Sequence, residues 1–195
     1  NKERSFQLKN RWTYTADNGF SLKMGGEFWR QEFSQSYQEA DGFLWNPFLE
    51  NNYLAGFAEA NIKISDRLLS RGGLRMEYSS ILKESRLSPR WSIAYKTGDH
   101  SQFSFAYGSF FQTPENEPLA VSTNLEFEQS THFILNFQKI HNDRIFRIEA
   151  YEKNYDQLIR MNGRNSLPNN GGYGYARGVD VFFRDRKTFK NVDYW

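Results

Sequence analysis

Hydrophobic and polar residues alternate along most of the chain with a period of two. In the first such segment, Phe6, Leu8, Trp12 and Tyr14 stand between polar neighbours. This spacing is typical of a β-strand with one apolar face and one wet face. The dipeptide Asn18-Gly19 then favours a tight turn, because both residue types tolerate the positive φ of hairpin loops. The chain is therefore predicted to open with a β-hairpin.

The same alternation recurs to the end of the chain and predicts nine strands. They are residues 6–16, 20–28, 53–64, 71–78, 89–96, 102–109, 131–139, 144–155 and 173–185, and residues 191–195 have the pattern of the start of a tenth. The 89–96 strand begins at Pro89, where a missing N–H would break no ladder bond. Helical spacing is rare, so an all-β fold is predicted.

The connections between these strands alternate in length. Short turns at 17–19, 65–67, 97–99 and 141–143 alternate with longer connections at 34–52, 79–88, 110–129 and 156–172. An antiparallel sheet with short turns at one edge and long loops at the other is the layout of an outer-membrane barrel. The segments are mostly about 8 to 13 residues long, near the 9 to 11 that cross a bilayer at a tilt. A soluble β-sandwich or β-propeller would also alternate, but strand length and loop order favour an antiparallel transmembrane β-barrel.

Composition agrees with a barrel wall and excludes other classes. With 38% hydrophobic residues and a mean hydropathy of -0.77, the chain has no apolar run long enough for a transmembrane helix. Barrel strands average lipid-facing and lumen-facing residues to such values, and the 17% aromatic content suits interfacial girdles. The 25 basic and 23 acidic residues are interspersed, which excludes a basic stripe for nucleic acid. Cysteine is absent, so disulfides and thiolate metal sites are excluded.

Several motifs resemble a known family over roughly the last two thirds of the chain, from Tyr53 onward. They are Leu87-Ser88-Pro89-Arg90, the stretch from Tyr107 to Pro114, the stretch from Arg147 to Tyr155 followed by Leu158, and Gly174-Tyr175-Ala176-Arg177-Gly178-Val179-Asp180. Their order and spacing resemble the TonB-dependent outer-membrane transporters. The resemblance implies that residues 1–195 are a segment of a large barrel of about 22 strands. The plug domain and the remaining strands would lie outside this segment.

The resemblance also implies a function and a location. The intact protein would sit in the bacterial outer membrane and import a scarce nutrient such as a ferric siderophore, haem, cobalamin or an oligosaccharide. Its partners would be the nutrient, outer-membrane lipid and the TonB energy-transducing complex, which would contact a plug segment N-terminal to Asn1. A passive porin or another non-transport barrel remains an alternative, as does a soluble β-sandwich binding module.

Two groups of residues are candidates for function. Polar positions of the alternating strands are expected to face the lumen and the plug; they include Arg75, Glu77, Arg90, Arg147, Glu149, Asp180 and Arg184. The small residues Gly174, Ala176 and Gly178 share one face of a strand and predict either room for a close approach or a local bulge; the resemblance implies that this space faces the plug. Rings and polar side chains in the long loops are expected to contact ligand: Phe43, Trp45, Phe48, Gln112, Glu115, Arg160 and Arg164.

Signatures of catalysis are missing from the sequence. His100, His132 and His141 are scattered and have no neighbouring nucleophile motif. No phosphate-binding glycine loop and no metal-spaced His, Asp or Glu cluster occurs. The sequence therefore predicts a protein that is not an enzyme and has no cofactor or metal.

Overall fold

The computed structural model describes residues 2–17, 19–38, 44–122, 124–161 and 166–188. These residues form eleven strands and one short helix. In chain order they are β1 (Lys2–Thr15), β2 (Phe20–Ser34), β3 (Tyr37–Gln38), β4 (Leu44–Trp45), β5 (Phe48–Lys63), β6 (Leu68–Ser79), β7 (Glu84–Gly98), β8 (Ser101–Gln112), α1 (Asn116–Val121), β9 (Glu128–His141), β10 (Arg144–Arg160) and β11 (Asn169–Asp185).

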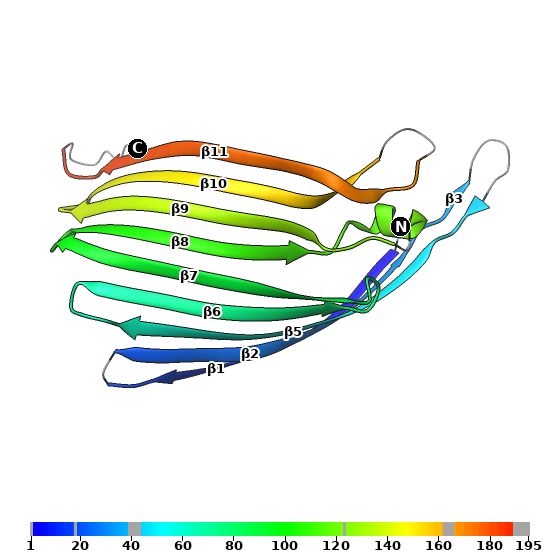
Figure 1. The fold of residues 1–195 in the computed structure, drawn as a ribbon, viewed down its shortest axis with the longest axis horizontal. Helices are drawn as coiled ribbons and strands as arrows, with labels where there is room; N and C mark the ends of the chain where they lie inside the picture. Colours follow the sequence, from blue (N-terminus) through cyan, green and yellow to red (C-terminus); the bar gives the residue numbers. More distant parts are fainter. Residues whose placement is uncertain (1, 18, 39–43, 123, 162–165, 189–195) are drawn as a thin grey trace.

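Nine long strands form a single curved antiparallel sheet, in the order β1-β2-β5-β6-β7-β8-β9-β10-β11 (Figure 1). The all-β prediction and its nine strands are confirmed. Each strand is longer than predicted, at 12 to 17 residues. β3 and β4 form a separate two-stranded ribbon between β2 and β5. The predicted tenth strand at 191–195 lies outside the described residues.

Tight turns join strand pairs along one edge of the sheet, on the left in Figure 1. Between β9 and β10, Asn142 and Asp143 have φ values of 51° and 59°. Consecutive positive φ values match the right-handed twist of a hairpin, and Asn and Asp accept them at low cost. Gly19, at φ 81°, has the same role between β1 and β2. These are turns that the sequence predicted.

The register gives the sheet two chemically different faces, because residues directly opposite in a ladder point to the same side. One face carries Leu8, Phe28 and Leu54 in one row and Ile148 opposite Val181 in another. Aromatic rings contact one another on this apolar face, with 4.7 Å between the centroids of Phe103 and Phe137. The opposite, polar face holds the charged residues described below. Alternation therefore predicted the two faces correctly.

The prediction of a long connection over residues 79–88 is wrong. β6 ends at Ser79 and β7 begins at Glu84, so only residues 80–83 join them, and the turn includes Lys83 at φ 55°. Glu84 lies opposite Ser79 in a ladder that continues without a break. On the apolar face of β7, Ser85 stands where an apolar residue is expected, so only Leu87 marks the alternation before Pro89.

The sequence predicts Pro89 at the start of a strand, but Pro89 lies inside β7. It pairs with Leu74 of β6, whereas the ladder between β7 and β8 ends one residue away, at Arg90 opposite Gly108. Pro has no N–H to donate, which accounts for the end of pairing on that side. Beyond this point β7 and β8 continue without pairing to each other. A gap between two adjacent strands results.

The predicted space above Gly174, Ala176 and Gly178 is only partly open. All three lie on the polar face, opposite Tyr155, Lys153 and Tyr151. A Cβ at Gly178 would lie 2.5 Å from the Tyr151 hydroxyl, whereas a Cβ at Gly174 would meet nothing within 4 Å. The register is regular along this stretch and shifts only between Tyr155 and Arg160. The space at Gly178 is therefore filled by the Tyr151 ring, and the predicted bulge is not at these glycines.

Candidate functional site

All seven charged residues predicted to point inward lie on the polar face. Arg75 and Glu77 are on β6, Arg90 on β7, Arg147 and Glu149 on β10, and Asp180 and Arg184 on β11. They form local contacts rather than one cluster. The Arg147 guanidinium lies 5.5 Å from the Phe182 ring centroid, and Glu149 accepts a hydrogen bond from Asn136 at 3.2 Å.

The densest charge contacts centre on Arg75. Its two terminal nitrogens donate to the two oxygens of Glu27 at 3.3 and 3.2 Å, and its Nε donates to Glu77. Lys9 Nζ lies 3.6 Å from Glu27 on the other side. The fork of a guanidinium matches a carboxylate in this two-point geometry. These charges satisfy one another across β1, β2 and β6, and we call them the Arg75 network.

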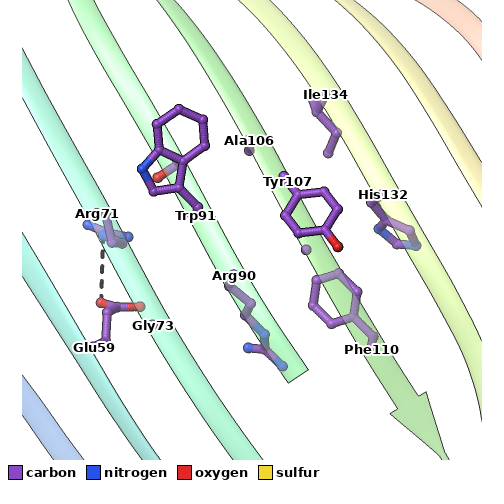
Figure 2. Close-up of a pocket in the computed structure, with 12 residues that line it drawn as sticks. Glu59, Arg71, Gly73, Arg90, Trp91, Ala106, Tyr107, Phe110, His132 and Ile134 are labelled. Atoms are coloured by element: carbon purple, nitrogen blue, oxygen red, sulfur yellow. Dashed lines mark ion pairs between the residues drawn. The ribbon is translucent and has the colours of Figure 1, made fainter. Parts of the chain in front are cut away.

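A shallow pocket of about 230 Å³ lies further along the sheet (Figure 2). Arg90 stacks over Phe110 at 4.6 Å, and the Phe110 ring lies 4.9 Å from the His132 imidazole. On the other side, Arg71 Nε lies 3.6 Å from Glu59. The arginine, ring and imidazole form a column in which the guanidinium is held over the electron-rich ring face.

The connection between β8 and β9 folds across the polar face instead of closing a short turn. We call residues 113–122 and 124–127 the strap. Its helix α1 lies beside the start of β1 in Figure 1, where Asn116 contacts Glu3 at 3.5 Å. Leu119, Leu125 and Phe127 are buried, and Phe127 is 0% exposed. The hydrophobic core of the described residues is thus concentrated under the strap.

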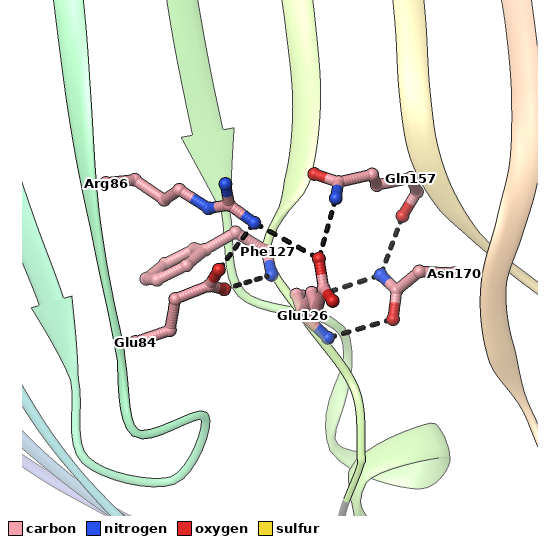
Figure 3. Close-up of polar contacts among 6 residues, drawn as sticks. All are labelled: Glu84, Arg86, Glu126, Phe127, Gln157 and Asn170. Atoms are coloured by element: carbon pink, nitrogen blue, oxygen red, sulfur yellow. Dashed lines mark hydrogen bonds and ion pairs between the residues drawn. The ribbon is translucent and has the colours of Figure 1, made fainter.

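The end of the strap is held by the main chain of Glu126 (Figure 3). Asn170 of β11 accepts from the Glu126 N–H at 2.8 Å and donates to the Glu126 carbonyl at 3.0 Å. The same amide group donates to the Gln157 carbonyl at 2.8 Å. Gln157 has φ 56° and lies at the register shift of β10. One side chain therefore joins the strap to two strands.

The gap between β7 and β8 receives the last residues of the strap. Phe127 N–H donates to Glu84 of β7 at 3.2 Å, and its ring meets Phe111 of β8 edge-on at 6.4 Å. Arg86 of β7 reaches Glu126 at 3.1 Å (Figure 3). The interruption beside Pro89 thus creates the place where the strap enters the polar face.

Two adjoining cavities lie between the strap and the polar face of β1, β2 and β5. They measure about 430 and 200 Å³ and share Trp29, Gln31, Asn51 and Thr113. We call this space the strap cavity. Its smaller compartment reaches the Arg75 network through Glu27 and Arg75.

These features were compared with known proteins. The family model described as TonB dependent receptor-like, beta-barrel matches residues 1–194. The chain belongs to this family. The resemblance drawn from the motifs is therefore confirmed, and so is the transmembrane barrel class. Members of the family are bacterial outer-membrane transporters and not enzymes.

Solved structures share the fold of this receptor barrel. The siderophore receptor PirA from Pseudomonas aeruginosa has a TM-score of 0.81 and 14% identity over 98% of this chain and 38% of its own. The FrpB iron transporter from Neisseria meningitidis has a TM-score of 0.77 and 15% identity, over 95% of this chain and 33% of its own. The copper transporter OprC has a TM-score of 0.73 and 15% identity, over 95% of this chain and 35% of its own. The chain thus spans about a third of their length. A search of curated proteins found no match.

The loop residues predicted to contact ligand occupy varied positions on the receptor barrel. Trp45 is on β4, Gln112 ends β8, Glu115 precedes α1 and Arg160 ends β10. Phe48 begins β5, opposite Ser34 and on the apolar face, rather than lying in a loop. Phe43 and Arg164 lie outside the described residues. Of these residues, Gln112 lines the strap cavity.

The histidines are less scattered than the sequence indicated. His100 and His141 come together at the tight-turn edge, with ring centroids 4.2 Å apart. His132 joins the Arg90 column instead. In the part of the chain that the structure describes, no group of three or more His, Cys, Asp or Glu side chains could hold a metal ion. The same residues contain no helix with the length and apolar character to cross a membrane.

The strap cavity is the part of the site that sequence analysis missed. Trp29, Gln31 and Asn51 follow the alternation of their strands onto the polar face, but the predicted strands stopped at Phe28 and began at Tyr53. Extending the period of two past both limits would have placed them correctly. The anchoring of Glu126 by Asn170, 44 residues later, has no comparable local signal.

Proposed function

We propose that the intact protein is an outer-membrane receptor that takes up a scarce nutrient by TonB-dependent, energy-coupled transport. The observation that carries this proposal is the family match over residues 1–194. PirA and FrpB, which share the fold, are described as a siderophore receptor and an iron transporter. Residues 1–195 would supply part of the barrel wall, and a plug domain and the contact with TonB would come from other parts of the protein.

In this proposal the apolar face contacts lipid and the polar face lines the lumen. Lipid-facing barrel residues are apolar, because charge is costly at bilayer depth, while lumen residues are wet. The aromatic contacts on the apolar face and the mutually satisfied charges of the Arg75 network support this orientation. The seven inward charged residues would then face the lumen and the plug.

The orientation is tested with two adjacent exposed residues of β11. Val179 and Asp180 point to opposite faces of the strand. We would place single cysteines at these positions in the full-length protein, freed of any other cysteine and reconstituted in liposomes. A lipophilic maleimide should label Val179→Cys, and a water-soluble one should label Asp180→Cys. The reverse pattern would mean that the two faces are exchanged.

The transport proposal is tested in cells that express the full-length protein. Accumulation should be measured for ferric siderophores, haem, cobalamin and oligosaccharides, with and without a deletion of the host TonB. Accumulation that requires both the receptor and TonB is expected for at least one of these nutrients. Uptake that is insensitive to the TonB deletion would identify a passive pore instead.

A further inference from the structure

The strap cavity has the dimensions of a ligand site and is built from two parts of the chain. Its two compartments of about 430 and 200 Å³ fall, taken together, within the roughly 300–1,000 Å³ typical of small-molecule sites. The sheet provides one wall and the strap provides the other. The strap residues that form this second wall follow directly after β8, and Asn116 among them contacts Glu3 of β1 at 3.5 Å.

The sheet wall is lined by uncharged hydrogen-bonding groups in two rows. The register places Ser5, Gln31 and Asn51 side by side in the first row. Gln7, Trp29 and Tyr53 form the second. Side-chain amides both donate and accept, and an indole or phenol ring offers a flat apolar surface beside a polar group.

The strap wall continues this chemistry. Thr113 and Asn116 add a hydroxyl and a further amide, and Pro114 and Leu119 add apolar surface. On the sheet side, Asn51 is only 8% exposed, and its Oδ1 accepts from the Ser79 hydroxyl at 2.9 Å. This bond holds the Asn51 amide in one orientation.

Charge is balanced around the strap cavity. The acidic residues that line it are Glu3, Glu27 and Glu32, and the basic residues are Arg4, Lys9 and Arg75. In the smaller compartment, Arg75 is bound by Glu27 and Glu77, and Lys9 is paired with Glu27. A multiply charged anion would find there no cation that is not already neutralised.

We propose that the strap cavity binds a neutral, polyhydroxylated ligand of the carbohydrate class. Amides at several points match the alternating donors and acceptors of sugar hydroxyls, and the Trp29 ring offers a surface for the C–H face of a pyranose. This inference rests on the proposed uptake function and names its substrate class. Ferric catecholates and other anionic chelates are the competing occupants.

The test uses the full-length receptor purified in detergent micelles, with heat-modifiable gel mobility as the check on folding. Binding is measured by calorimetry for neutral hexasaccharides of glucose, mannose, galactose and xylose, and for ferric enterobactin. At least one hexasaccharide should bind. Trp29→Ala and Gln31→Ala should each weaken its binding about tenfold, by removal of a stacking surface and of a two-way hydrogen-bonding group. Trp29→Phe should retain most of it.

Arg30→Gln is the matched control, because Arg30 lies between Trp29 and Gln31 in β2 but points to the opposite face. It should bind the sugar like the unmodified receptor. Binding of ferric enterobactin alone, of none of the probes, or of a sugar unaffected by Trp29→Ala and Gln31→Ala would overturn the inference. TonB-dependent uptake of a ferric chelate only would refute the carbohydrate class and leave the transport function standing. Sugar binding with TonB-independent uptake would support the carbohydrate class and refute the energy-coupled transport function.

Discussion

Replacing Arg75 by Met should destabilise the receptor by leaving two carboxylates without their cation. The side chains of Arg75, Glu27 and Glu77 are only 16%, 19% and 7% exposed. Removal of one partner from a fully buried ion pair costs about 3 to 5 kcal/mol. Glu27 keeps Lys9 and some solvent, so we expect the loss to be about 2 to 4 kcal/mol.

The decisive comparison is between Arg75→Met and the triple variant Glu27→Gln/Arg75→Met/Glu77→Gln. The triple variant removes the stranded charges together with their cation, so its stability should return to within about 1 kcal/mol of the unmodified protein. Urea unfolding of the full-length receptor in micelles, followed by heat-modifiable mobility, measures both. An Arg75→Met variant as stable as the parent, or a triple variant as unstable as the single one, would refute the idea that stranded charge is the cause.

Three further outcomes are expected. Ile148→Arg, on the apolar face, should cost about 2 to 4 kcal/mol at bilayer depth, while Ser92→Arg on the polar face should be mild; equal tolerance of the two in the same urea assay would contradict the assigned faces. Gly178→Ala should cost about 1 to 3 kcal/mol because it displaces the tyrosine ring above it, while Gly174→Ala should not; similar unfolding midpoints would contradict this. Asn170→Ala removes about 2 kcal/mol of anchoring, so amide exchange in the strap should accelerate about 30-fold; unchanged exchange would show that the strap is held elsewhere.

The sheet could be predicted because the alternation of apolar and polar residues within each strand shows which of its faces contacts water. Phe6, Leu8 and Trp12 reveal a strand without any knowledge of its partners, and Asn142-Asp143 reveals a turn in the same local way. This signal fails where both faces are polar. It therefore missed the first residues of β7, which begins at Glu84, and the residues around Trp29 and Gln31.

The candidate site could not be predicted because it depends on contacts between distant residues. Glu27 and Arg75 are 48 residues apart, and Arg86 and Glu126 are 40 apart. A one-dimensional pattern places each of these side chains on a face but does not select its partner. The strap was expected only as a loop, since its path over the polar face depends on the gap beside Pro89.

The strap begins and ends on neighbouring strands that are already paired, since Gln112 lies opposite Glu128. The sheet therefore does not need the strap to set its register. Loop-closure entropy rises only slowly with length, by about 0.6 kcal/mol for each doubling, so the strap can lengthen or shorten at little cost to the pairing of β8 with β9. The sheet is thus the part whose pairing must be kept, and the strap is the part whose length can vary. The same sheet can then carry straps of different length.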